Sequence, residues 1–386
     1  MKIGILTSGG DVPGLNACIK AITEGAEQND WETVGIKRGW KGLFDYNPDG
    51  DPLKNSKLSL PLNSAELRGI ENIGGTILHT SRFNPVQIDE AFLPEFLLGH
   101  VPPSKFKEGA FDCTDHVLNV LEAMEIDVLV PIGGDGSLRF AAHLSKQNFP
   151  IISIPKTMDN DVNGTDYCIG FSTCVTRCVD SINKLKSTAA SHERIAIIEL
   201  FGRHSGEPAL LSGHIAAADR VLIPEAPVDL EHFSDLIIAD RENNSDNYAI
   251  AVVAEGVKLA DGDNIYQGQT DHYGNDKLGG IGKTIYDHLR TNHNANVLTQ
   301  PLAYLLRSGE PDALDKLISI NFGTMAIQMI EQKNFGKMTA IVDGNYQVTD
   351  NDCVLKEQPS LIIENLYDIK TYRPDIKNIL GRPMYL

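Results

Sequence analysis

Three short loops, two that combine glycine with aspartate and one that contains two aspartates, each follow an apolar run of the chain. They read Thr7-Ser8-Gly9-Gly10-Asp11-Val12-Pro13-Gly14, Gly133-Gly134-Asp135-Gly136-Ser137 and Pro155-Lys156-Thr157-Met158-Asp159-Asn160-Asp161. Glycine lets backbone amides approach an anion closely, and a helix that follows adds a favourable dipole. A carboxylate beside such a loop can hold Mg²⁺. These residue types predict a site for a phosphate group and a metal ion.

The third loop contains the groups that a metal-assisted phosphoryl transfer requires. One carboxylate takes the proton of the attacking hydroxyl, another supports the metal, and a lysine neutralises charge on the moving phosphoryl group. Asp159, Asp161 and Lys156 supply these groups. Plainer explanations remain open: a tight turn for the first loop, a helix start for the second and Asx-turns for the third. The second and third loops together favour chemistry.

Arginine suits bidentate contacts with phosphate, and four arginines stand at expected loop positions or strand ends. These are Arg82, Arg194, Arg203 and Arg307. Any one of them could be an ordinary surface ion pair, but the group favours phosphate binding.

The elements that must position these residues alternate between strands and helices. Apolar runs predict strands at 3–7, 126–132, 151–155, 195–200, 220–223 and 248–254, and helical spacing predicts helices at 16–27, 138–144 and 171–185. Apolar runs without polar alternation indicate parallel strands buried on both faces. The expected fold class is therefore doubly wound α/β, in which ligands bind at the carboxyl ends of the strands.

Three other segments have a predicted local structure. Residues 84–109 are expected to form a loop with a short helix, and 261–276 a surface loop. The run Gly279-Gly280-Ile281-Gly282-Lys283-Thr284 resembles the end of a phosphate-binding loop, but Lys277 stands where the first glycine of that motif belongs. We therefore interpret it as a helix start.

Composition excludes several classes of protein. The 386 residues have a mean hydropathy of −0.17 and a formal charge of −18, which disfavours nucleic-acid binding. No apolar run reaches the length of a membrane span. Six cysteines form no C-x-x-C pair, and Cys174 and Cys178 lie on an apolar helical stripe, which favours core thiols over metal ligands. A cytoplasmic protein is expected.

Several motifs in a fixed order resemble the phosphofructokinase family. They are Leu6–Asn16, Gly133–Ser137, Pro155–Asp161, Gly164–Asp166, Ser191–Arg194 and Phe201–Arg203. The resemblance is dense from Met1 to Pro224 and touches only Glu255-Gly256 and Leu306–Gly323 beyond. It implies two Rossmann-like domains with mostly parallel sheets and an active site in the cleft between them. A donor-binding domain is expected from 1–165 with about 300–345, and a sugar-phosphate domain from about 166–299 with 346–386.

The resemblance also implies a role for each site residue. Asp159 would be the base for the sugar 1-hydroxyl, assisted by Lys156, Thr157 and Arg203, and Asp135 with Asp161 would bind Mg²⁺. The phosphoryl donor would contact Gly10, Arg82, Phe83, Gly134, Asp135, Gly136 and Ser137. The sugar phosphate would contact Thr157, Met158, Asp159, Arg194, Phe201, Gly202, Arg203, Glu255, Tyr304 and Arg307. Arg194 would reach it from a neighbouring subunit, which implies a homodimer or homotetramer.

One position favours ATP as the donor. In the family, an aspartate at the position of Gly136 blocks ATP and marks pyrophosphate users, whereas Lys156 is compatible with either donor. The expected reaction is therefore glycolytic formation of fructose 1,6-bisphosphate from ATP and fructose 6-phosphate. A pyrophosphate-dependent enzyme is the alternative.

Departures from the family pattern keep other readings open. Leu298 replaces an arginine that serves the sugar phosphate across the subunit boundary, and Tyr304 and Ser308 also depart from the usual motif. Arg290 or His293 could compensate, or the acceptor could be another sugar phosphate such as sedoheptulose 7-phosphate. A catalytically weak regulatory subunit is the non-enzyme alternative. NAD kinases and diacylglycerol kinases share the second loop but lack the third.

Overall fold

The chain forms two compact units, seen here in a computed structural model that describes residues 1–98, 110–260, 280–356, 363 and 366–377, and the backbone of 106–107, 266–270 and 276–278. The first unit comprises Met1–Thr157, Val162–Gly170 and Gly309–Gln358; the second comprises Met158–Asp161, Phe171–Ser308 and Pro359–Leu386. The chain therefore changes unit several times.

A seven-stranded sheet forms the centre of the first unit. Its order is β16 (Asn345–Asp350), β15 (Lys337–Val342), β8 (Ile152–Pro155), β7 (Val128–Gly133), β1 (Lys2–Ser8), β2 (Glu32–Ile36) and β3 (Ser59–Leu62). The strands from β15 to β2 are parallel, and the edge strands β16 and β3 are antiparallel. Ile3, Ile5 and Leu6 of β1 are fully buried, as the unbroken apolar run predicts. The predicted mostly parallel α/β class is confirmed.

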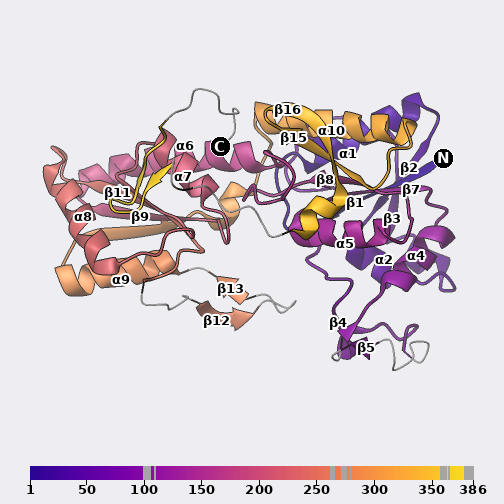
Figure 1. Cartoon of the computed structure of the whole chain (residues 1–386), viewed down its shortest axis with the longest axis horizontal. Helices are drawn as coiled ribbons and strands as arrows, with labels where there is room; N and C mark the ends of the chain where they lie inside the picture. Colours follow the sequence, from indigo (N-terminus) through magenta and orange to yellow (C-terminus); the bar gives the residue numbers. More distant parts are fainter. Residues whose placement is uncertain are drawn as a thin grey trace. The chain divides into compact units, whose positions relative to one another are not determined.

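Helices cover both faces of this sheet (Figure 1). α1 (Leu15–Gln28) and α10 (Ala313–Glu331) pack together on one face. α2 (Trp40–Asp45), α4 (Thr114–Ala123) and α5 (Asp135–Ser145) lie on the other, around the buried ring of Trp40. α3 (Pro52–Asn55) lies between β2 and β3 in the chain, and the turn η1 (Ile70–Asn72) follows β3. The first unit thus has a layered architecture in which helices shield both faces of the parallel sheet from solvent.

The segment predicted as a loop with a short helix contains more structure than expected. The helical turn η2 (Glu90–Phe92) is present, but β4 (Ile88–Asp89), β5 (Phe106–Lys107) and β6 (Ala110–Phe111) form a small antiparallel sheet. Strands of two residues are too short to produce a visible alternation, so the sequence gives no sign of them.

The second unit has a four-stranded parallel sheet. Its order is β10 (Arg220–Leu222), β11 (Ala249–Ala254), β9 (Ile195–Leu200) and β14 (Val297–Pro301). α6 (Phe171–Ser191) and α7 (Glu207–Ile215) lie on one face, and α8 (Leu230–Asn243) packs with α9 (Ile281–His293) (Figure 1). Cys174 and Cys178 are buried and free on α6, as predicted. The edge strand β14 was not predicted, because its second half, Thr299-Gln300-Pro301, is polar.

Other predictions near α9 are tested in part. α9 begins directly after Gly280, so the interpretation of 279–284 as a helix start is confirmed. The segment 261–276, predicted as a surface loop, contains β12 (Tyr266–Thr270), which pairs with β13 (Asp276–Leu278). The prediction was therefore wrong for the paired residues, and the rest of it lies outside the described residues.

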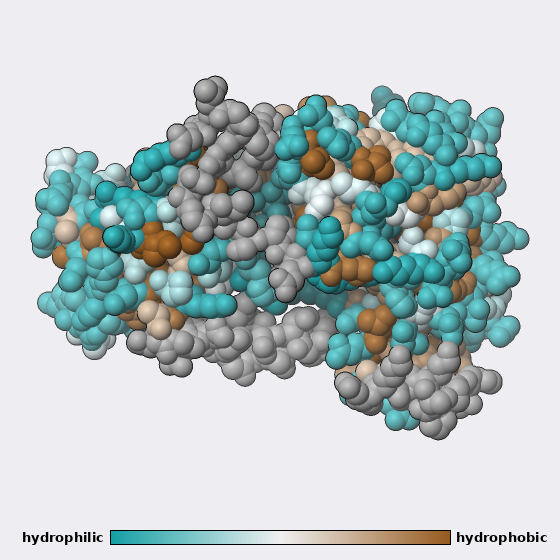
Figure 2. Space-filling model, in the orientation of Figure 1, coloured by the Kyte–Doolittle hydropathy of each residue, from teal (hydrophilic) through white to brown (hydrophobic). Residues whose placement is uncertain are grey.

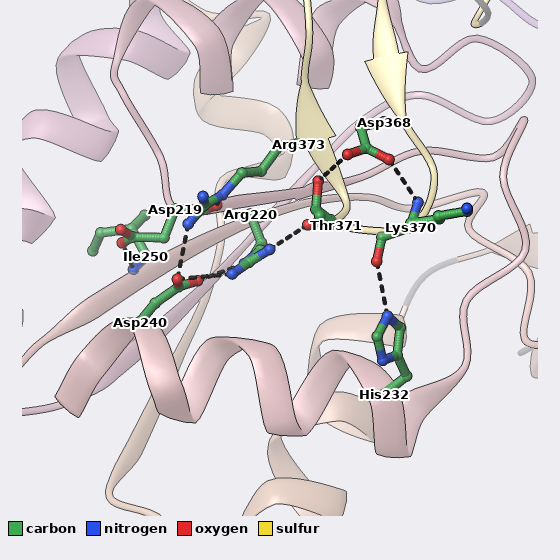
Figure 3. Close-up of polar contacts among 9 residues, drawn as sticks. All are labelled: Asp219, Arg220, His232, Asp240, Ile250, Asp368, Lys370, Thr371 and Arg373. Carbon is green, nitrogen blue, oxygen red and sulfur yellow. Dashed lines mark hydrogen bonds and ion pairs between the residues drawn. The ribbon is translucent and has the colours of Figure 1, made fainter. Parts of the chain in front are cut away.

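A polar network fastens the C-terminal strands β17 (Tyr367–Asp368) and β18 (Arg373–Pro374) to the second unit (Figure 3). The guanidinium of Arg220 is almost fully buried, pairs with Asp240 on α8 and donates to the Thr371 carbonyl. Arg373 donates to the same carboxylate at 2.8 Å. A buried arginine with its hydrogen bonds satisfied in this way fixes the position of the segment that it contacts.

Among the described residues, none of the helices combines the length and apolar character needed to cross a membrane. Figure 2 shows a surface that is mainly hydrophilic, with apolar residues in small separated groups. This distribution agrees with the formal charge of −18.

Candidate active site

The two glycine and aspartate loops and the loop of Lys156 begin at one edge of the first sheet. β7 lies between β1 and β8, and the register pairs Ser8 with Gly133 and Gly133 with Pro155. Because parallel strands end at the same edge, the loops that follow these residues are neighbours. The arrangement matches the loop placement expected from the sequence.

Lys156 occupies the centre of this edge. Only 3% of the residue is exposed, and its ammonium group donates to the Gly10 carbonyl at 2.6 Å. A Cβ on Gly9 would lie 3.2 Å from the Lys156 Nζ atom, and Gly9 has a φ of +90°. Glycine is therefore required there both for the backbone conformation and for the approach of the lysine. A buried cation between glycine-rich loops favours an anionic ligand.

The second loop leads directly into α5. Gly134 is the N-cap of this helix, and Asp135, Gly136 and Ser137 form its first turn. The first backbone N–H groups of a helix have no partner within the helix and favour negative charge. Gly136 is exposed, and a Cβ built on it would meet nothing within 4 Å. The loop thus offers free space beside a phosphate-binding helix start.

Arg82 and Phe83 are brought to the same loops by a hydrogen-bonded connection. The Gly9 amide donates to the Ser81 carbonyl at 2.9 Å, which places the following Arg82 beside the first loop. Arg82 is exposed, whereas Phe83 packs on the Phe44 ring with centroids 4.7 Å apart. An exposed arginine beside a buried aromatic anchor can contact a charged ligand without reorganising the core.

Asp135 has one carboxylate oxygen available for a metal ion. Its Oδ2 atom accepts from Arg139 Nε at 2.8 Å, one turn further along α5. Its Oδ1 atom is buried and has no hydrogen-bond partner among the described residues. A buried carboxylate oxygen is costly unless it is paired or coordinates a cation, so this donor fits Mg²⁺.

A second set of strand ends gathers the candidate sugar-phosphate residues in the second unit. The register pairs Leu200 of β9 with Ala254 of β11, and Glu199 with Pro301 of β14. The residues that follow these ends are therefore neighbours: Phe201, Gly202, Arg203, Glu255, Tyr304 and Arg307. They lie at the carboxyl edge of a parallel sheet, the edge at which such sheets bind ligands.

Aromatic and glycine contacts shape this cluster. The Arg307 guanidinium carbon lies 4.7 Å from the centroid of the Phe201 ring, and Tyr304 is in edge contact with the same ring. The Gly256 amide donates to the Gly202 carbonyl at 3.1 Å. A Cβ on Gly256 would lie 2.0 Å from the Arg203 carbonyl oxygen, so any other residue would displace the arginine's backbone. The two arginines are thus held by stacking and by close backbone contact.

Asp159 and Glu255 influence each other electrostatically. Burial, followed by the negative charge of Asp159, raises the pKa of Glu255 from 4.5 to about 7, against the opposing effect of Arg203 and Arg307. The carboxylates of Asp159 and Glu255 and the guanidiniums of Arg203 and Arg307 are therefore close enough to influence the same pKa. Perturbed carboxyl groups of this kind are typical of functional sites.

The raised pKa of Glu255 predicts a pH-dependent loss of stability. Between pH 4.5 and about 7 the folded protein holds a proton that the unfolded chain has released, so stability falls as the pH rises through this window. Glu255→Gln should remove this dependence and raise the free energy of unfolding at pH 8 by at most about 3 kcal/mol. Thermal unfolding at pH 5 and pH 8 measures the effect.

Glu122→Gln, on the exposed side of α4, is the control and should change the stability at neither pH. If Glu255→Gln stabilised the protein equally at both pH values, the raised pKa of Glu255 would be contradicted.

Two residues that the sequence analysis did not single out hold the loop of Asp159. Asn160 is buried with a φ of +54°, and its side-chain amide donates to Glu207 Oε2 at 3.1 Å. Glu207 is itself buried at the start of α7. The sequence signal was an asparagine between two aspartates, since asparagine tolerates the left-handed conformation better than most residues. Glu207 gave no such signal.

Other candidates lie away from this cluster. Arg194 immediately precedes β9, and Leu298 pairs with Ala196 near the start of the same strand. Both positions are thus near the amino-terminal edge of the sheet, roughly 20 Å from the residues that follow β9. Part of the Arg194 guanidinium, its Nε atom, is buried without a hydrogen-bond partner among the described residues.

Arg290 and His293 do not compensate for Leu298 within this unit. Arg290 is exposed and donates to the Tyr286 hydroxyl at 2.7 Å, and His293 contacts Glu231. Both are in the last turns of α9, whose opposite end contacts Glu199 at the carboxyl edge of the sheet. The helix runs back along the sheet, so its C-terminal residues cannot lie beside Arg203. They therefore cannot replace the missing arginine in their own subunit, and compensation in the site of a neighbouring subunit stays a prediction.

Comparisons with known proteins agree with the motifs. The family described as Phosphofructokinase matches residues 2–330. An ATP-dependent 6-phosphofructokinase of Chloroflexus aurantiacus is 35% identical over 88% of this chain and 87% of its own length. A pyrophosphate–fructose 6-phosphate 1-phosphotransferase of Dictyoglomus thermophilum is 32% identical over 96% of this chain and 98% of its own length.

Solved structures show the same fold. The phosphofructokinase of Saccharomyces cerevisiae has a TM-score of 0.70 at 22% identity, covering 92% of this chain and 45% of that chain. A pyrophosphate-dependent phosphofructokinase from Marinobacter aquaeolei has a TM-score of 0.76 at 17% identity, covering 97% of this chain and 88% of that chain. At these identities the likeness shows the fold alone, and the site residues must be argued from their own geometry.

Proposed function

Because the chain belongs to the phosphofructokinase family, we propose that it transfers a phosphoryl group from ATP to the 1-hydroxyl of fructose 6-phosphate with the help of Mg²⁺. The observation that carries this proposal is the edge at which two glycine-rich loops surround the buried Lys156. Such an edge binds phosphate groups, and the carboxylate and arginine cluster of the second unit supplies the complementary acceptor groups.

The donor residues are those of the first unit. The backbone amides at the start of α5, from Gly134 to Ser137, would bind the donor phosphates, and Lys156 would neutralise charge on the transferred group. The remaining part of the donor would contact Arg82, Phe83 and Gly10. Preorganised donors and charges of this kind lower the barrier because they require no reorganisation during reaction.

The acceptor residues are those that follow the strands of the second unit. Asp159 would accept the proton of the sugar 1-hydroxyl, and Glu255 would accept hydrogen bonds from other hydroxyls. Arg203 and Arg307 would bind the existing phosphate of the sugar, with Phe201 and Tyr304 beside them. Thr157, Met158 and Gly202 would complete the contacts.

The available oxygen of Asp135 supports a role for this residue in metal binding, with Asp161 as the second candidate ligand. Bound Mg²⁺ supplies positive charge that offsets the charge developing on the phosphates. Asp135 is held in place by Arg139, so its free oxygen is already oriented before a ligand binds.

The choice of ATP rests on the open space at Gly136. An unobstructed backbone at this position leaves room for a nucleotide, whereas the buried Lys156 is compatible with either donor. The matched relatives include both ATP-dependent and pyrophosphate-dependent enzymes. Pyrophosphate is therefore the competing donor, and a larger sugar phosphate such as sedoheptulose 7-phosphate is the competing acceptor.

We also propose a homo-oligomer, a dimer or a tetramer, in which Arg194 serves the sugar-phosphate site of a neighbouring subunit. Arg194 stands at the wrong edge of its own sheet to reach Arg203, and its Nε atom is buried without a partner among the described residues. An arginine placed in this way has donors left for a ligand of another subunit.

Initial rates test the proposed reaction. With purified protein, Mg²⁺ and fructose 6-phosphate in a coupled assay, we expect product with ATP and a much lower rate with pyrophosphate. Activity with pyrophosphate alone would assign the protein to the other donor class. Activity with neither donor, but with sedoheptulose 7-phosphate and ATP, would overturn the acceptor. Inactivity under all conditions would support the regulatory subunit instead.

A further inference from the structure

A group of three potential metal ligands lies away from the strand ends that carry the candidate active site, where the start of α8 meets the end of α9. Glu231 is in the first turn of α8, and His288 and His293 are in the last turns of α9. The Nε2 atoms of the two histidines lie 3.0 Å and 2.9 Å from the same carboxylate atom, Glu231 Oε2. All three ligand atoms lie within 4.8 Å of one another.

We propose that Glu231, His288 and His293 bind a divalent transition-metal ion of the zinc class, with water as the fourth ligand. Two imidazole nitrogens and one carboxylate oxygen are a common ligand set for zinc. Metal–ligand distances of about 2.0–2.2 Å place tetrahedral ligand atoms about 3.3–3.5 Å apart. Each of the two oxygen–nitrogen distances therefore needs to increase by only a few tenths of an ångström to admit the ion.

The surroundings of the group support metal binding. The hydrogen bonds from His288 and then His293 lower the pKa of Glu231, so its carboxylate is ionised near neutral pH. About one fifth of each histidine side chain is exposed, and the Glu231 side chain is more exposed still, which leaves an entry path. The Asn292 amide lies 3.2 Å from His288 Nδ1. With the metal on Nε2, Nδ1 carries the proton, and the Asn292 carbonyl can accept it after the amide rotates.

Without a metal, the same residues form a favourable contact between two helix ends. A carboxylate is stabilised at a helix N-terminus, and a histidine cation at a C-terminus. This contact explains the presence of two hydrogen bonds. It does not require that both histidine nitrogens point at the same carboxylate oxygen. Convergence of both Nε2 atoms on Glu231 Oε2 is what distinguishes a ligand set from an ordinary pair.

A bound ion would fix α9 at both ends. Its first amides, those of Gly280 and Gly282, already donate to the Glu199 carboxylate at 3.1 Å and 2.8 Å. The ion would attach the opposite end of the helix to α8. We expect it to stabilise the second unit rather than to take part in phosphoryl transfer.

Cobalt and zinc titrations test the site. The tag-free full chain, freed of metal with a chelator and kept in excess Mg²⁺, should bind one Co²⁺ with the intense visible absorption of four-coordinate cobalt. Zn²⁺ should displace it and raise the midpoint of thermal unfolding. His288→Ala, His293→Ala and Glu231→Gln should each weaken Zn²⁺ binding by more than the 10- to 100-fold that loss of an outer partner costs. Asn292→Ala should have a smaller effect, of about 10-fold.

Controls keep the result interpretable. His192→Ala removes an exposed histidine elsewhere in the same unit and should leave both titrations unchanged. Circular dichroism checks that every variant folds. If cobalt gives only the weak spectrum of a six-coordinate ion, or binds equally well to the His288→Ala/His293→Ala protein, the proposal is wrong and the three residues form hydrogen bonds only.

Discussion

Asp159→Asn should lower kcat by about 100- to 10,000-fold while ATP binding stays close to that of the unaltered protein. Removal of a positioned general base costs this much because the sugar hydroxyl must then lose its proton without help. The asparagine has nearly the same size, so the loop held by the bond between Asn160 and Glu207 should persist. A coupled assay gives kcat, and titration calorimetry gives the affinity for ATP.

The same variant has a second, independent signature. Because the charge of Asp159 helps to raise the pKa of Glu255, its removal should lower that pKa. Asp180→Asn removes an exposed carboxylate of α6 and should change neither turnover nor this pKa. A turnover within a factor of a few of the original, with the Glu255 pKa lowered, would show that Asp159 is folded correctly but is not the base.

Mixing this variant with Arg194→Ala tests the proposed exchange of arginines between subunits. Each variant alone should be nearly inactive. In a mixed oligomer, one site combines an intact Asp159 with an intact Arg194 from its neighbour, so activity should return well above that of either protein. Activity that simply averages the two variants would place Arg194 outside the site of the neighbouring subunit.

Gly136→Asp should abolish most use of ATP without affecting stability. A Cβ at this position meets nothing within 4 Å, and a carboxylate in the first turn of α5 is favourable for the helix. Toward a nucleotide phosphate the new charge is repulsive. At about 4 Å and an effective dielectric constant near 20, two like charges cost about 4 kcal/mol, which corresponds to roughly 1,000-fold in kcat/KM.

Matched variants separate the charge from the volume in this experiment. Gly136→Asn adds nearly the same volume without charge, and Gly136→Ala adds a methyl group only. We expect kcat/KM for ATP to fall in the order Ala, Asn, Asp, with thermal unfolding unchanged in all three. Unchanged use of ATP by the Gly136→Asp protein would show that the nucleotide does not pass this position, and the preference for ATP would lose its structural basis.

The α/β class, six of the parallel strands and most of the strand-end loops follow from local sequence, whereas the strands β2, β14 and β15 were not predicted. Ile3, Ile5 and Leu6 form an unbroken apolar run, and such runs are stable only as strands buried on both faces. Glycine and aspartate directly after them are recognisable because backbone approach to phosphate requires glycine. These features depend on neighbours within a few residues, which a single sequence contains.

Long-range contacts determine which side chains lie close together, and the sequence alone did not predict these contacts. Burial and then the charge of Asp159 raise the pKa of Glu255, and Arg203 and Arg307 oppose this shift. The parallel register of β9, β11 and β14 brings Glu255 together with the two arginines, whereas Asp159 belongs to the loop that follows β8. The same register places Arg194 at the opposite edge from Arg203, and the direction of α9 places Arg290 and His293 away from Arg203 of their own chain. The convergence of His288, His293 and Glu231 needs two helices packed side by side. Sequence alone determined which residue types follow each strand; tertiary structure decided which of them meet, because charge, burial and ligand geometry depend on distance in space.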